Sequence, residues 1–548
     1  MTIRWSFWIA AALFVSTTAH DALLVDAFVV TTKPWNFNSP TSTATMRTTG
    51  NVRSLKWQRP ILSTALSADA VKESVADNQG TDITVYGATG VTGKYVLQYL
   101  RDAAEAYDRP LRVTLAGRNQ AKLESQKAIL LEERRKEQTD KARGNQGTSA
   151  ADEAAVEFDI FVASSEDLSR LKVMAERTKV VISCAGPFEK YSSGVVEACA
   201  NEGTDYVDIS AEHVWVAEMR TKHGPAAAAS GARLVSFCGF DSVPSDLAAF
   251  GAVQALREAS NEHDTVDIKK VISLVFAVGG LNGGTMETVS RIPLDIGKMF
   301  FKPDGRLRNV PFFGEDPLIG ATCEPESAET ESIRDTMARA EWKNQLLWLD
   351  PSRGYTVTAP FFMAPLNSKT VQRSAFELGY GKNFEYYERF ISVPEDMLEQ
   401  AGILTAIPAT LVQLMFGLGF SLTRLPVVGE EIVKTLFPPG SAAPDIFNKQ
   451  CLTQVHASAY PSDESSSNGM YGLCNLDFEG DPGNLATSQC VAESALCLLW
   501  NRDELPPKTH DGFGTPAQQL GAALLHRLEH TTIRPIKVKR SVAQDGDR

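Results

Sequence analysis

The stretch "ITVYGATGVTGKYVLQYL", residues 83–100, decides the fold of this chain. A β-branched run ends at Tyr86, glycines follow at the spacing G-x-x-G-x-x-G, and apolar residues then recur at helical spacing. The first glycine permits a tight turn, the second lets a pyrophosphate reach the backbone, and the third lets the helix pack on the strand. We therefore predict a strand, a turn and a helix that bind a dinucleotide through Gly87, Ala88, Thr89, Gly90, Val91, Thr92 and Gly93.

The next strand indicates which dinucleotide is bound. Residues 111–116 form a second apolar run, and Gly117 and Arg118 follow it. A domain that binds NAD commonly has Asp or Glu at this point to accept a hydrogen bond from the ribose 2′-hydroxyl, whereas a guanidinium suits a 2′-phosphate. Arg118 therefore favours NADP(H) over NAD(H). The alternative is a solvent-exposed arginine without a ligand.

Strands and helices continue to alternate after this point. Further strand-like runs lie at 158–162, 180–184 and 205–210, with helical patterns between them. This alternation predicts a doubly wound parallel sheet, and hence the α/β class. The charged stretch 132–155 is predicted to be an exposed insertion without chemistry. The turn after the fourth strand is expected to lie over the cofactor near its nicotinamide, through Cys184, Ala185, Gly186 and Pro187.

Composition excludes several classes of function. A chain of 548 residues suggests two or three domains. The net charge is −13 and no long basic run occurs, which argues against nucleic-acid binding. The eight cysteines form no C-x-x-C pair, so we expect buried thiols rather than zinc ligands or disulfides, and no other metal-ligating cluster stands out.

The N-terminus is predicted to be a separate targeting segment. Residues 1–25 carry an early positive charge and an apolar run, as a signal peptide does. Within 26–80, the stretch from 27 to 68 has five basic residues and no Asp or Glu, which is typical of a transit peptide. The tandem resembles the two-part leader of proteins sent to secondary plastids in heterokont algae, with Phe28 at the expected place. A plain secretory signal and an uncleaved membrane anchor are the alternatives.

Several longer motifs carry a family resemblance over about residues 82–530. In chain order they are "GATGVTG", "LAGRN", "CAGPFEKYSSGVVEAC", "YVDISAEH", "FCGFDSVPSDL", "GGLNGGTMETVSRI", "FEGDPGNLATSQCVAESALCL" and "GFGTPAQQLGAALLHRL". Their order and residues resemble the saccharopine dehydrogenase-like oxidoreductases, a group that includes the mycobacterial trans-acting enoyl reductases. The chain departs from the usual forms at Ala211, where Gly is common, and at Asn484, where an aromatic residue is common.

The resemblance implies a split architecture and a homodimer as one oligomeric state. A Rossmann domain binds NADP(H), an α+β substrate or dimerisation domain is inserted after it, and the last helices return to the Rossmann domain. The implied boundaries are 81–245, 246–477 and 478–535, followed by a flexible tail at 536–548.

A reductase also needs a proton donor, because the cofactor supplies only the hydride. Polar residues after the nicotinamide turn are the candidates, since ligands of α/β sheets bind at strand ends. His213, Ser242 and Asp246 lie in the same zone. The alternatives are a helix cap for Asp246, a turn-forming role for Asp241 and a surface position for His213. The predicted catalytic residues are Tyr191, Asp208, Glu212 and Asp241.

Residues 400–423 contain no charged side chain. Three interpretations remain open for this apolar segment: a peripheral contact with a membrane or lipid droplet, a buried core or dimer helix, and a membrane span.

Three functions remain open as well. The first is an NADP(H)-dependent oxidoreductase of a small-molecule or lipid-like acyl substrate, such as a polyketide-like intermediate. The second is an amino-acid dehydrogenase of the saccharopine reductase type, which would need clustered cations for its carboxylates. The third is a non-catalytic NADP-binding protein of lipid surfaces.

Overall fold

The computed structural model describes the part of the chain that follows the predicted leader, in several ranges. Within these ranges no helix is both long enough and apolar enough to cross a membrane. The predicted leader, residues 145–155 of the charged insertion, the "GGLNGG" motif and the apolar segment 400–423 lie outside the described residues. The described ranges are 80–144, 156–260, 266–277, 348–350, 356–361, 363–381, 383–393, 452–463 and 469–544, with the single residue 435.

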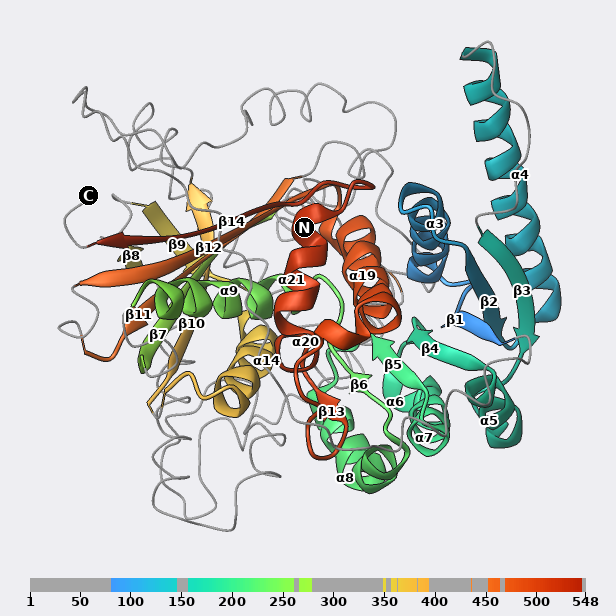
Figure 1. Ribbon diagram of the computed structural model, residues 1–548, viewed down its shortest axis with the longest axis horizontal. Coiled ribbons are helices and arrows are strands. Elements are labelled where there is room, and N and C mark those ends of the chain that lie inside the picture. Colours follow the sequence, from blue (N-terminus) through green and yellow to red (C-terminus); the bar gives the residue numbers. More distant parts are fainter. Residues whose placement is uncertain are drawn as a thin grey trace, which may run out of the picture. The chain divides into compact units, whose positions relative to one another are not determined.

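The first sheet is parallel throughout and confirms the predicted fold class (Figure 1). Its order is β13-β6-β5-β4-β1-β2-β3, so the glycine turn after β1 lies near the point where the strand order reverses. The strands are β1 (Thr81–Tyr86), β2 (Leu111–Gly117), β3 (Val156–Val162), β4 (Thr178–Ser183), β5 (Asp205–Asp208), β6 (Leu234–Val235) and β13 (Phe513–Gly514).

Helices cover both faces of this sheet and bury two separate apolar clusters. On one face α3 and α19 pack on each other, and α19 also contacts β4 and β5. On the other face α5, α7 and α8 pack side by side. The helices are α3 (Val91–Ala106), α4 (Gln120–Gly144), α5 (Leu168–Glu176), α6 (Phe188–Tyr191), α7 (Ser193–Glu202), α8 (His213–Ser230), α9 (Val243–Ala259) and α19 (Thr487–Trp500).

A second, mixed sheet has the order β14-β12-β11-β7-β10-β9-β8 (Figure 1). Only β7 and β10 pair in parallel, and α9 and α14 pack on this sheet. Its elements are β7 (Ile268–Ala277), β8 (Trp348–Asp350), β9 (Thr356–Pro360), α14 (Ala364–Glu377), β10 (Glu385–Val393), β11 (Leu452–Pro461), β12 (Met470–Glu479) and β14 (Lys537–Gln544).

The predicted flexible tail at 536–548 needs a correction over its described part. Residues 537–544 form β14, which pairs antiparallel with β12 from Asp477–Lys537 to Met470–Gln544. The segment is polar, so its own pattern does not predict a strand. The strand forms because its backbone makes hydrogen bonds to β12, a sheet strand that lies far from it in the sequence.

The last helices connect the two sheets. α21 contacts α19, α9 and β14, and α20 contacts α9 and α14. Asp246 lies in the first turn of α9, and its buried carboxylate accepts a hydrogen bond from Ala517 N at 2.8 Å. This carboxylate therefore binds the backbone of α20 and does not cap its own helix. The remaining elements are η7 (Arg502–Glu504), α20 (Pro516–Gln519) and α21 (Gly521–His530).

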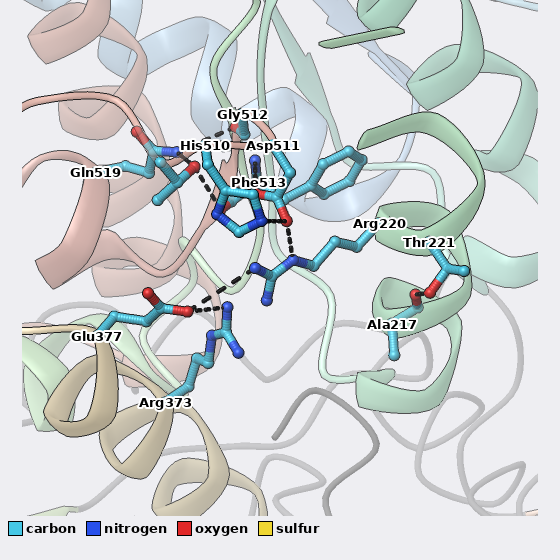
Figure 2. A network of polar contacts seen from close by, with 11 residues as sticks. Ala217, Arg220, Thr221, Arg373, Glu377, His510, Asp511, Gly512, Phe513 and Gln519 are labelled. Carbon is cyan, nitrogen blue, oxygen red and sulfur yellow. Dashed lines mark hydrogen bonds and ion pairs between the residues drawn. The ribbon is translucent and has the colours of Figure 1, made fainter. Parts of the chain in front are cut away.

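A network of ion pairs also joins the sheets (Figure 2). Arg220 from α8 bonds Asp511, which precedes β13, and its guanidinium lies 3.8 Å from Glu377 of α14. Arg373, one helical turn earlier on α14, pairs with the same Glu377. The network holds the helix that carries part of the candidate pocket against the nucleotide-binding sheet.

Candidate functional site

The glycine turn has the geometry that a pyrophosphate needs. Gly87 has φ +83°, and a Cβ there would lie 2.9 Å from Ala185 N. A Cβ on Gly93 would lie 2.4 Å from Gly87 O. No side chain caps α3 at Gly90, and its first turn holds no acidic residue. The amides at this helix end therefore face an open, positively polarised position that suits an anion.

Cationic side chains gather beside this turn. Arg118 is exposed at the end of β2, and its guanidinium carbon lies 5.8 Å from the centroid of the Tyr191 ring. Lys190 Nζ lies 5.0 Å from the same ring. Burial raises the pKa of Tyr86 to about 12, with Ser165 and Arg118 acting against this rise. The two cations suit a 2′-phosphate, and the ring of the predicted donor Tyr191 contacts both of them.

Replacing Arg118 with Ala is expected to weaken NADPH binding about 10- to 100-fold, because each charge-assisted hydrogen bond to a phosphate contributes on the order of 1.5–3 kcal/mol. NADH lacks the phosphate, so its affinity should stay unchanged. Fluorescence titration with both cofactors measures the effect. Arg112→Ala, an exposed arginine on the same strand, is the matched control. Equal losses for NADPH and NADH would contradict the assignment.

The turn after β4 is held in place by Glu212, one of the predicted catalytic residues. Its two carboxylate oxygens accept hydrogen bonds from Phe188 N at 2.9 Å and Glu189 N at 2.8 Å. The carboxylate thereby caps α6, directly after Gly186 and Pro187. Burial raises the pKa of the Cys184 thiol to about 12, so this predicted cofactor-binding cysteine is unreactive. Catalysis by Glu212 stays a prediction, but the geometry gives the residue a positioning role.

The carboxylate of Asp208 is likewise bound by other groups of the protein. Its buried carboxylate accepts five hydrogen bonds, from the Tyr206 hydroxyl, the Ser210 amide and hydroxyl, the Ser236 hydroxyl and the Phe237 amide. Burial raises its pKa, and these bonds act in the opposite direction. The carboxylate ties β5 to the loop after β6, which is a structural role; proton transfer by Asp208 stays a prediction.

His213 is buried, so the surface alternative is wrong for this residue. Its ring stacks on Phe237 with centroids 4.4 Å apart, and Nε2 lies 3.2 Å from the Thr370 hydroxyl. Burial and, to a lesser extent, Lys369 lower its pKa to about 3. The imidazole is therefore neutral at physiological pH and carries no charge toward a substrate.

Asp241 is the predicted catalytic residue that lies in a pocket. The loop between β6 and α9 carries it to the space between the two sheets, at the edge where parallel strands present ligands. Burial among apolar side chains raises its pKa to about 6. The pocket is small and is lined, among the described residues, by Phe240, Asp241, Pro244, Ser245, Val275, Phe361, Met363, Asn367 and Val455.

A second acid, Glu388 on β10, lies behind this pocket and was missed by the sequence analysis. It is fully buried, and Ser245 Oγ donates to its Oε1 at 2.5 Å. Tyr386 OH donates to the same oxygen at 3.2 Å. The available signal was strand alternation, since Glu388 falls in a row with Phe384, Tyr386 and Phe390. An acid in an aromatic row marks a buried charge that needs an explanation.

The two most specific motifs meet beside the pocket. Phe240 N donates to Thr487 Oγ1 at 3.2 Å, and that hydroxyl donates to Pro482 O at 3.0 Å. Asp481 caps the π-helix η6 (Pro482–Ala486) by accepting from Asn484 N. The "GFDSVPSDL" and "GDPGN" segments therefore form one structural unit, although they lie far apart in the sequence.

Among the described residues, one group has the spacing of metal ligands: His526, Glu529 and His530 on α21. All three are exposed to solvent, where such groups are common without an ion. We assign the group no role.

Comparisons with known proteins agree with this geometry. The family model "Saccharopine dehydrogenase NADP binding domain" matches residues 83–235, which include the glycine turn and Arg118. This match confirms NADP(H) as the cofactor, and the described cradle and cations fit it. The reduced form would supply a hydride.

Similarity to whole proteins extends well beyond this domain. A Mycobacterium tuberculosis protein named as a candidate trans-acting enoyl reductase is 31% identical over 452 residues, which cover 82% of this chain and 95% of that protein. The trans-acting enoyl reductase of Mycobacterium bovis is 28% identical, with 82% and 95% covered. The solved saccharopine dehydrogenase (L-Glu forming) of Saccharomyces cerevisiae aligns with a TM-score of 0.42 at 13% identity, over 84% of this chain and 100% of that one.

Proposed function

This chain belongs to the family of the trans-acting enoyl reductases, and on that premise we propose that it reduces the carbon–carbon double bond of a lipid or polyketide-like acyl intermediate with NADPH. One observation carries the proposal: 31% identity extends over 95% of the length of such a relative, beyond the nucleotide-binding part alone. The apolar lining of the pocket supports an acyl group as the substrate.

Different residues of the chain would have different roles in such a reaction. The glycine turn and Arg118 hold the phosphates of the cofactor, which brings its hydride when bound. Phe240, Val275 and Phe361 present apolar surface to the pocket, which suits a hydrocarbon chain. Asp241 places a carboxyl group at the pocket wall, where it adds to the acidic character of the site.

The saccharopine-type alternative is less well supported by the same pocket. A substrate with several carboxylates requires arginine or lysine side chains that pair with them. Among the residues that the structure describes, those that line the pocket include an aspartate and no cationic side chain. An acidic pocket wall would repel such a substrate.

The decisive measurement is NADPH oxidation by the purified full chain with a series of enoyl thioesters of increasing chain length. We expect turnover that rises with chain length, because each buried methylene adds on the order of 0.8 kcal/mol of binding free energy. The comparison substrate is a semialdehyde together with glutamate, the pair that a saccharopine reductase would use. Turnover of that pair alone, or of no substrate at all, would contradict the proposal.

We further propose, from composition, that residues 1–80 direct the protein through the secretory pathway to a secondary plastid and that 400–423 contact lipid. A fluorescent fusion of residues 1–70 tests the first point, and secretion of the fusion would contradict it. Flotation of the full chain with vesicles, with and without 400–423, tests the second.

A further inference from the structure

A chain of polar groups leads from the pocket to a buried acid. Ser245, in the first turn of α9, lines the pocket, and its hydroxyl lies 2.5 Å from Oε1 of Glu388 on β10. Asn367 of α14 donates its Nδ2 to the same hydroxyl oxygen at 3.3 Å. Two elements, α14 and β10, thus converge on a serine of α9 that lies far earlier in the sequence.

We propose that Ser245 is the catalytic group that gives the substrate its proton and that Glu388 is the positioning residue that replenishes this proton. The inference rests on the proposed function and deepens it. In the step, the hydride forms a new C–H bond at the carbon distal to the carbonyl, and the electron pair of the double bond moves toward the carbonyl. Ser245 then gives its proton to the carbon next to the carbonyl while the carboxylic proton of Glu388 moves to Ser245 Oγ. The products are the saturated acyl group, the oxidised cofactor and a Glu388 carboxylate, which regains a proton from solvent.

The hydrogen-bond geometry aims the serine proton at the pocket. A hydroxyl has one proton to donate and two lone pairs that accept. When Glu388 is protonated, its O–H and the Asn367 amide can occupy both lone pairs of Ser245 Oγ. The only remaining direction for the serine proton is away from both partners, on the side that lines the pocket. When Glu388 is ionised, the serine donates to it instead and is withdrawn from the substrate.

The surroundings keep Glu388 protonated near neutral pH. Burial raises its pKa to about 7; among the weaker influences, Ser245, Asn367 and Tyr386 lower it, and the negative charge of Asp241 raises it. Asp241, with a pKa of about 6, ionises first. Two acids whose environments separate their pKa values are a recurrent feature of sites that transfer protons.

The test compares Glu388→Gln, which retains the shape and hydrogen bonding of the side chain, with Ser245→Ala and the control Glu385→Gln. Glu385 lies on the same strand, and its carboxylate accepts from Tyr387 OH. We expect both relay variants to lose about 10²-fold or more in kcat, the range of general acid catalysis, with unchanged NADPH affinity. The kcat of the wild type should fall as pH rises through about 7, because the protonated form of Glu388 is the active one. Glu388→Gln should lose this dependence.

The outcomes separate the inference from the proposed function. Wild-type turnover combined with a wild-type rate and pH profile in Glu388→Gln overturns the relay alone, as does an equal loss in Glu385→Gln. No turnover of any enoyl thioester by the wild type overturns the proposed function and the relay with it. Infrared difference spectra of wild type against Glu388→Gln need no substrate, and a carboxylic acid band that titrates near neutral pH supports the protonated acid. Absence of that band overturns the relay even in an active enzyme, and thermal unfolding of each variant identifies misfolding.

Discussion

Gly93→Val is expected to weaken NADPH binding severely. Even a single Cβ at this position would lie 2.4 Å from Gly87 O and 3.0 Å from Ala88 Cα, and both contacts are backbone. No side-chain rotation can relieve them, so α3 must move away from the turn. Overpacking of this kind costs about 1–3 kcal/mol or more, and each 1.4 kcal/mol is tenfold in affinity. We expect a loss on the order of 100-fold, since the helix N-terminus leaves the phosphates.

Fluorescence titration with NADPH measures this loss, and circular dichroism verifies that the variant is folded. Gly117→Ala is the control at the same edge of the sheet, because its Cβ would meet no atom closer than 3.7 Å. An affinity of Gly93→Val within threefold of the wild type would show that the turn does not carry the cofactor.

Arg527→Met is expected to cause the largest loss of stability. Glu493 on α19 is fully buried, and its carboxylate is bonded by Arg527 at 2.6 and 2.7 Å and by the Tyr99 hydroxyl at 2.7 Å. Removal of the guanidinium leaves a buried carboxylate without its cation, which costs about 3–5 kcal/mol of the free energy of unfolding. The site joins α3, α19 and α21, so the loss should affect the cooperative unit as a whole.

Urea denaturation of the variant measures this cost. The double variant Arg527→Met with Glu493→Met should recover most of the loss, because it removes the unpaired charge as well. Arg540→Met is the surface control: Arg540 pairs with Glu258 at 3.9 Å with both side chains exposed, and its loss should stay below about 1 kcal/mol. A small effect at Arg527 would mean that Glu493 is solvated or neutral in the native protein.

The two halves of the chain differ in how far their sequence predicts their structure. The first sheet follows local signals: β-branched runs, glycines at fixed spacing and helical periodicity, all within short windows. The fold class, the glycine turn and NADP(H) could therefore be predicted. The second sheet pairs strands that lie far apart, such as β7 with β10 and β12 with β14. No local pattern encodes which strands pair, and polar β14 was expected to be a tail for that reason.

The candidate site shows the same division. Four acidic or phenolic side chains could be selected from the sequence because they follow strand ends. Their roles could not, since Glu212 and Asp208 differ from Asp241 only in what surrounds them: backbone amides and hydroxyls in the first two, apolar side chains in the third. Glu388 was not among the predicted catalytic residues, because only the tertiary structure of the second domain brings its strand close to the pocket.

The sequence by itself determined the nucleotide-binding fold, its cofactor and the family, since backbone conformation at a glycine turn and the periodicity of buried faces depend on neighbouring residues. Only the tertiary structure decided which acids accept hydrogen bonds from the protein and which acid faces an apolar pocket. It also brought Ser245 Oγ to 2.5 Å from Glu388 Oε1. Hydrogen bonding, burial and the pKa values that follow from them depend on groups brought together from far along the chain, and these contacts exist only in the folded protein.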